Sequence, residues 1–275
     1  MSEFWETQEG FESEAGWNTK DRIRAAEDPK ATRIEELEFS LHRAYEESIE
    51  MVQEISDISI DQKDGDSISD EKYDKLGYEA VDTLIFLKKA GDTLEGGINE
   101  YLREERIERY DEEGGEALEE LLEPVRNPEL DNEKQRTRGL VARTEDIYGE
   151  LGPNPESSDF DFIIESEVDE VLQENLYKQV ADIKENGEYK NENELGRKLA
   201  STMLDVVELM EYLPRENSRY FEEKQEENEE RLGSGEDFGV GDHGYGRTPE
   251  WLITDDISQA PESSYIEMVS KSVSA

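Results

Sequence analysis

The chain has 275 residues, of which 74 are Asp or Glu and 30 are Lys or Arg, so its formal net charge at pH 7 is −44. The absence of cysteine excludes disulfides, thiolate catalysis and cysteine-bound zinc, and two histidines argue against a histidine metal site or a Ser-His triad. No apolar stretch approaches the ~18 residues of a membrane span, and no signal peptide is visible. The negative charge argues against binding nucleic acid through its phosphates, which requires a basic patch.

The acidic residues are spread along the whole chain and are not confined to one tail. In molar salt the Debye length is about 3 Å, so neighbouring carboxylates hardly repel one another, whereas in dilute buffer they loosen the compact state. We therefore predict a halophilic protein, located in the cytoplasm of an extreme halophile or in the virion of a virus that infects one. A DNA mimic, with carboxylates in place of phosphates, is the competing interpretation.

The first part of the chain combines aromatic residues with a long helix. Residues 1–30 show no clear period and are predicted to form an extended arm. Residues 31–58 are predicted to be helical, because Thr32 and Glu35 fit a capping box and apolar residues follow a heptad stripe. That stripe comprises Ile34, Leu37, Leu41, Ala44, Ser48, Met51, Ile55 and Ile58. Such a seam packs against another helix, in the same chain or in a neighbour.

The next segments alternate between turns and helices. Residues 59–71 are rich in turn-formers and should break the first helix. Residues 72–91 contain the most apolar run, Tyr78–Leu87, and are predicted to be a central helix. A charged helix should follow at 98–110, and a short apolar helix should stop at Pro124.

The second half shows weaker signals. Residues 160–164 are the one strand-like run, and helical periodicity returns at 166–185, 192–213 and 219–232. The glycine-rich tail from 233 carries short apolar anchors. With the aromatic residues of the first arm, these anchors are predicted to bind protein partners: Trp5, Phe11, Trp17, Trp251, Leu252, Tyr265 and Ile266. For the aromatic residues of the first arm, the alternative is that they dock on the body of the same chain.

These segments predict a mainly α protein built from antiparallel helical hairpins or a bundle, with extended N- and C-terminal arms and at most one short strand region. The predicted divisions are an arm at 1–30, a helical subdomain at 31–123, a connector at 124–160, a second helical subdomain at 161–232 and an extended tail at 233–275.

Two acidic groups have a spacing that suits chemistry. Glu46, Glu47 and Glu50 lie on the first long helix, and Glu79 and Asp82 lie one turn apart on the central helix. Antiparallel packing would bring Glu47, Glu50, Glu79 and Asp82 together. Four carboxylates could bind one or two Mg²⁺ ions, which polarise a triphosphate and activate water.

This Glu-Glu-x-x-Glu and Glu-x-x-Asp pattern resembles that of the all-α nucleoside triphosphate pyrophosphohydrolases related to MazG and the dimeric dUTPases. The resemblance covers about residues 33–110 and implies Mg²⁺-dependent cleavage of a nucleoside triphosphate to a monophosphate and pyrophosphate. Downstream arginines, Arg103, Arg106 and Arg109, could neutralise phosphate charge. The second half lacks the pattern, since Thr202 stands where a Glu would pair with Asp205. The alternative interpretation is a solvated acidic face, with Glu79 and Asp82 favoured at a helix N-terminus.

The function predicted first is structural: a homo-oligomer subunit that binds itself and other proteins without a cofactor, with a virion head–tail connector or neck component as its most specific form. The heptad seam, the aromatic anchors and the lack of a secure catalytic set motivate this hypothesis. The second is the Mg²⁺-dependent pyrophosphohydrolase. The two separate on one question of geometry, namely whether the carboxylates of the first and central helices converge.

Overall fold

The computed structural model describes residues 2–14, 16, 18–64, 67–110, 136–140 and 192–234. All regular structure in these ranges is helical, which confirms a mainly α protein. The predicted strand at 160–164 and the predicted helix at 166–185 lie outside them. None of the described helices has the length and apolar character needed to span a bilayer.

The described helices correspond closely to the predicted segments. Two differences concern the first 64 residues: the segment 1–30 contains two helices and is not an extended arm, and the first long helix continues past 58. The bounds are α1 Ser2–Glu14, α2 Thr19–Ala25, α3 Pro29–Asp64, α4 Asp70–Gly91, α5 Asn99–Tyr110, α11 Glu192–Met210 and α12 Asn217–Ser234.

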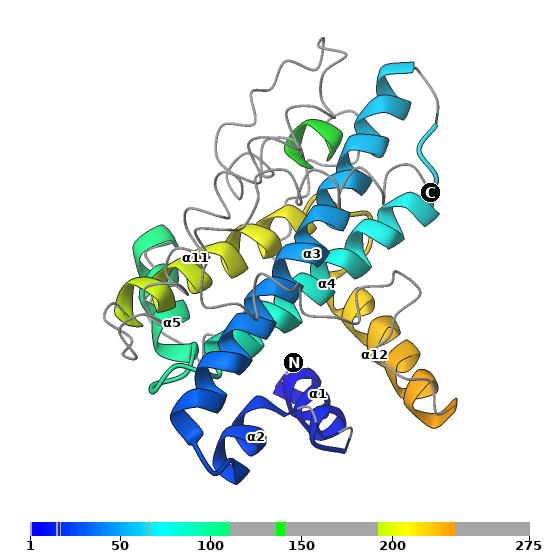
Figure 1. Ribbon diagram of the computed structural model, residues 1–275. Helices are drawn as coiled ribbons and strands as arrows, with labels where there is room; N and C mark the ends of the chain where they lie inside the picture. The colour runs from blue at the N-terminus through cyan, green and yellow to red at the C-terminus, as the bar shows by residue number, and fades with distance from the viewer. Residues whose placement is uncertain are drawn as a thin grey trace, which may run out of the picture.

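The helices α3 and α4 form an antiparallel hairpin, because only five residues separate them, and they lie side by side in Figure 1. The predicted heptad stripe of α3 faces α4 and is buried from Leu37 to Ile58, with Ile34 partly buried at its start. Within the apolar run of α4, Val81, Leu84, Ile85 and Leu87 are also buried, and Phe86 is partly buried. The apolar seam of α3 is therefore buried by a helix of the same chain.

Both halves of the chain contribute to one hydrophobic core. The helix α11 packs on α4 and α5, and α12 packs on α4. The helix α1 reaches the same core, where the ring of Trp5 meets that of Phe221 edge-on at 5.9 Å. The carboxylate-bearing hairpin is thus covered by helices from both ends of the described chain (Figure 1).

The crossing of α12 over α4 depends on a glycine. A Cβ atom at Gly77 would lie 2.3 Å from the buried ring of Tyr220, closer than any normal contact. Gly77→Ala should therefore destabilise the fold by about 1–3 kcal/mol through overpacking. Denaturant unfolding in molar KCl measures this change.

The matched control for this prediction is Gly10→Ala in the exposed part of α1. Nothing lies within 4 Å of a Cβ at that position, so alanine should stabilise the helix by up to about 1 kcal/mol through its higher helix propensity. Equal effects of the two substitutions would contradict the close contact between α4 and α12.

Candidate metal centre

Three of the four predicted carboxylates converge. One carboxylate oxygen from each of Glu47, Glu50 and Glu79 lies within 4.8 Å of the other two. Glu47 is buried, and Glu50 and Glu79 are half-buried. Of the four carboxylates whose convergence the pyrophosphohydrolase prediction requires, three therefore lie together, and Asp82 is not among them.

The positions of these residues on their helices explain the convergence. Glu47 and Glu50 are three residues apart on α3 and share one face. Glu79 is the tenth residue of α4, which begins at Asp70. The stabilising effect of a helix N-terminus fades within the first turn, so placing Glu79 and Asp82 at a helix N-terminus was wrong. Their location in mid-helix needs another explanation.

The cluster concentrates uncompensated negative charge. Burial, together with the charges of Asp82, Glu50 and Glu79, raises the pKa of Glu47 from 4.5 to about 9, although Arg43 opposes the shift. Burial, together with Asp82 and Glu50, raises the pKa of Glu79 from 4.5 to about 8. Without a cation, the site therefore retains protons at neutral pH.

Asp82 has a different partner. Its carboxylate forms an ion pair with Lys224 of α12, with 2.7 Å between the carboxylate oxygen and Nζ. Burial is the main cause that raises the pKa of Asp82, and Lys224 opposes it. Lys224 also acts electrostatically on Glu79. Lys224 could not be predicted from the sequence, because it lies in a charged helix more than 140 residues from Asp82 and no local pattern marks it.

Arg43 is the second cation at the cluster. It donates to the carboxylate of Glu47 at 2.6 Å, and its guanidinium lies 5.2 Å from the ring centroid of Phe86 on α4. Arg43 stands four residues before Glu47, so the common i, i+4 ion-pair spacing could have identified it. The two cations reach the cluster from different elements.

The donor set suits a hard divalent cation. Carboxylate oxygens are the ligands that Mg²⁺ prefers, and two ligands of one Mg²⁺ lie no more than about 4.2 Å apart. Oxygens that lie within 4.8 Å of one another reach this spacing through small side-chain movements. Glu47, Glu50 and Glu79 would hold the ion, while Asp82 is paired with Lys224 at the edge of the site.

The predicted phosphate-binding arginines are not placed at this cluster by any described contact. Arg109 instead pairs with Asp205 on α11 at 2.5 Å and donates to Ser201 at 2.6 Å. This pairing joins α5 to α11. In the second half, the hydroxyl of Thr202 donates to the Lys198 carbonyl within α11.

The residues predicted to bind partners fall into two groups. Trp5 and Phe11 are buried within the chain, at 4% and 8% exposure, so a partner could reach them only if α1 left the body. The side chains of the others lie outside the described residues: Trp17, Trp251, Leu252, Tyr265 and Ile266.

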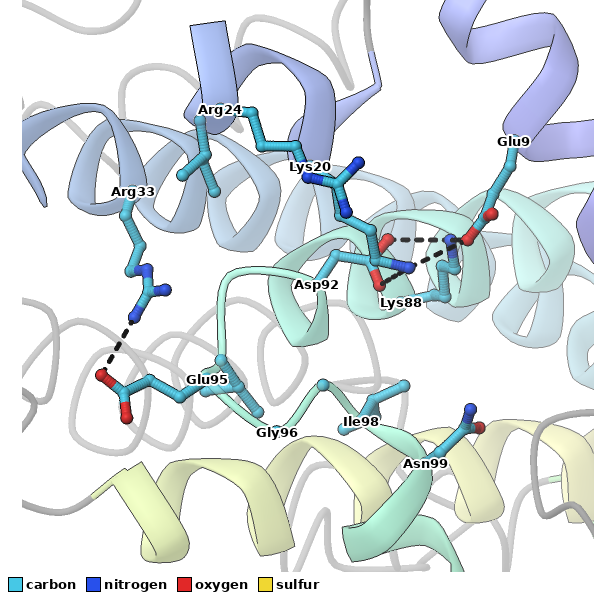
Figure 2. Close-up of a pocket in the computed structure, with 13 residues that line it drawn as sticks. Glu9, Lys20, Arg24, Arg33, Lys88, Asp92, Glu95, Gly96, Ile98 and Asn99 are labelled. Carbon is cyan, nitrogen blue, oxygen red and sulfur yellow. Dashed lines mark hydrogen bonds and ion pairs between the residues drawn. The ribbon is translucent and has the colours of Figure 1, made fainter. Parts of the chain in front are cut away.

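A cavity of about 430 Å³ lies at the C-terminal end of α4, between that helix, α1 and α2 (Figure 2). At one side of it, Lys20 and Lys88 both pair with Glu9 and Asp92, at distances of 2.7–3.2 Å. This closed ring offsets its own charges and holds α1 and α2 to α4. Lys88, the ring residue nearest to Glu79 in the sequence, lies nine residues beyond it, about 14 Å along the helix, so the ring does not belong to the carboxylate cluster.

When compared with protein-family models, curated proteins and solved structures, the chain matches none of them. The resemblance to the pyrophosphohydrolases therefore rests on the acidic motif alone, and the geometry of the carboxylate cluster is what supports an inference about function.

Proposed function

We propose that the protein is a Mg²⁺-dependent hydrolase that cleaves nucleoside triphosphates to monophosphates and pyrophosphate. The observation that carries this proposal is the convergence of Glu47, Glu50 and Glu79 from two helices. The spacing of these acids matches the motif on which the resemblance rests. The raised pKa values of Glu47 and Glu79 further support a place that a cation would stabilise.

The structural hypothesis has lost much of its motivation. The heptad seam of α3 is covered by α4 of the same chain, and Trp5 packs on Phe221. Neither feature now requires a second subunit. The carboxylates that a solvated acidic face would spread apart lie together instead. Such a cluster is unfavourable unless a bound cation or protons offset its charge.

A Mg²⁺ ion at this cluster would supply charge neutralisation for the phosphates and a lowered pKa for water. In the reaction, a water oxygen bonds to the α-phosphorus while the bridging bond to the β-phosphate breaks. Pyrophosphate leaves with that electron pair, and the water proton passes to a carboxylate of the cluster. Arg43 and Lys224 border the cluster and place positive charge beside the phosphates.

The direct test is product analysis with the full-length protein in molar KCl, where the Debye length is about 3 Å and self-repulsion is screened. Incubation with a mixture of nucleoside triphosphates and Mg²⁺ should give monophosphates and pyrophosphate in equal amounts, and EDTA should stop the reaction. Three results would contradict the proposal: no cleavage of any triphosphate, cleavage that persists in EDTA, or release of the terminal phosphate.

A further inference from the structure

We propose that Phe39, supported by Phe86, stacks on the base of the substrate, so that the same face of the hairpin binds both ends of a nucleoside triphosphate. The inference rests on the proposed function, because the carboxylate cluster is taken to hold the phosphates. It adds the substrate determinant that the acidic residues do not supply.

The two helices place these groups in one line. On α3, Phe39, Arg43 and Glu47 follow at intervals of four residues, which keeps them on one helix face. On α4, Phe86 lies seven residues, or two turns, beyond Glu79. The carboxylates are therefore followed along the hairpin by a guanidinium and then by two aromatic rings.

Side-chain contacts join these groups into one surface. The rings of Phe39 and Phe86 meet edge-on with centroids 6.4 Å apart. Arg43 lies 5.2 Å from the centroid of Phe86 while it contacts Glu47. Arg43 thus stands between the carboxylates and the rings, where a triphosphate anchored on the carboxylates would place its charge. The contact with Glu47 also shows that the guanidinium already reaches the cluster.

Phe39 is available for such a contact. It is 47% exposed, whereas Phe86 is partly buried and Leu37 and Leu41 are buried. Eight residues separate it from Glu47, so the base would lie about 12 Å along α3 from the cluster. Edge-on support by Phe86 holds the ring in place and lowers the entropy cost of stacking.

Stacking on an aromatic ring recognises the flat face that every base presents, and contributes about 1–3 kcal/mol per base. A site that uses this contact accepts different bases with similar KM values, because stacking does not read hydrogen-bond patterns. Phe39 should therefore strengthen the binding of nucleoside triphosphates relative to inorganic triphosphate, and should contribute little to the choice among bases.

The experiment compares the KM for a nucleoside triphosphate with the inhibition constant of inorganic triphosphate, in molar KCl with Mg²⁺. Phe39→Ala should raise the KM roughly 5- to 100-fold, which corresponds to the loss of one stacked base. It should leave kcat and the inhibition constant close to those of the parent protein. Phe39→Trp should restore the KM, because it restores a stacking surface.

The matched control is Ile60→Ala, which removes another exposed apolar side chain of α3, 44% exposed, beyond the carboxylates. It should change neither constant. An unchanged KM in Phe39→Ala overturns the inference while the proposed function stands. The inference is also overturned if Phe39→Ala weakens the binding of both ligands equally, or if inorganic triphosphate does not inhibit. A parallel change in oligomeric state overturns it too, because a second copy of the chain would then cover Phe39. A parent protein that cleaves no nucleoside triphosphate overturns both proposals.

Discussion

Glu50→Gln and Glu79→Gln should each lower Mg²⁺-dependent pyrophosphate release by roughly 100-fold or more, since each removes one of the three oxygen ligands available to the cation. The substitutions preserve side-chain size and relieve like-charge repulsion, so the helical fold should persist. Circular dichroism in molar KCl verifies the fold, and initial rates across a range of Mg²⁺ concentrations measure the loss. A higher Mg²⁺ requirement would assign the loss to ion binding.

Glu54→Gln is the matched control, because Glu54 lies one turn beyond Glu50 on the same helix. It repels Glu50 and Glu79 only weakly, its stronger charge interactions include Lys75 and Lys72, and it is not one of the three converging residues. Activity should stay within a few-fold of the parent. Parent-level activity in both Glu50→Gln and Glu79→Gln would remove the carboxylate cluster from the mechanism.

The helices of the hairpin could be predicted because their signals are local. The heptad stripe of α3 and the apolar run of α4 follow directly from side-chain periodicity. The end of α3 was predicted too early, at 58, because its last turns are rich in polar residues that usually favour turns. In the structure, the hydroxyl of Ser59 donates to the carbonyl of Ile55, so this residue continues the helix.

The N-terminal helices escaped prediction for a different reason. The helix α1 contains a glycine, Gly10, and no regular apolar period, so little in its sequence favours a helix. Its side chains are organised by tertiary contacts, such as Trp5 with Phe221 and Glu9 with Lys88. These partners are more than 75 residues away, and no pattern within α1 identifies them.

The carboxylate cluster could be predicted in part. The spacing of Glu47, Glu50 and Glu79 along two helices is visible in the sequence, but a chain with 74 acidic residues produces such spacings by chance. Only the register of α3 against α4 distinguishes a cluster from a solvated face. The place of Lys224 beside Asp82 depends on how α12 crosses α4, and this crossing requires a residue without a Cβ atom at position 77.

The cluster should also control how stability depends on pH. Burial and the like charges of Asp82, Glu50 and Glu79 raise the pKa of Glu47 from 4.5 to about 9, while Arg43 opposes them. Glu79 behaves similarly, with its pKa raised to about 8 against the influence of Lys224, while Glu54 adds to the repulsion. Between about pH 4.5 and 9 the folded protein therefore binds more protons at these sites than the unfolded chain does. The contribution of these two groups to the free energy of unfolding of the metal-free protein should therefore fall as the pH rises through this window.

Glu47→Gln should therefore stabilise the metal-free protein at pH 8, on the order of 1–3 kcal/mol, because a neutral amide replaces a carboxyl that must take up a proton on folding at a pH far above its ordinary pKa. The gain should shrink as the pH falls and vanish below about pH 4.5, where the carboxyl is protonated in both the folded and the unfolded state. Mg²⁺ should stabilise the parent at pH 8 and have much less effect on the variant. Thermal unfolding in molar KCl at several pH values, with and without Mg²⁺, measures both effects. The control variant is Glu222→Gln, at an exposed position of α12, which should change the free energy of unfolding by less than about 0.5 kcal/mol. A variant less stable than the parent at pH 8 would contradict the repulsion between Glu47 and its neighbouring carboxylates. Equal Mg²⁺ stabilisation of the two proteins would show that Glu47 does not bind the cation.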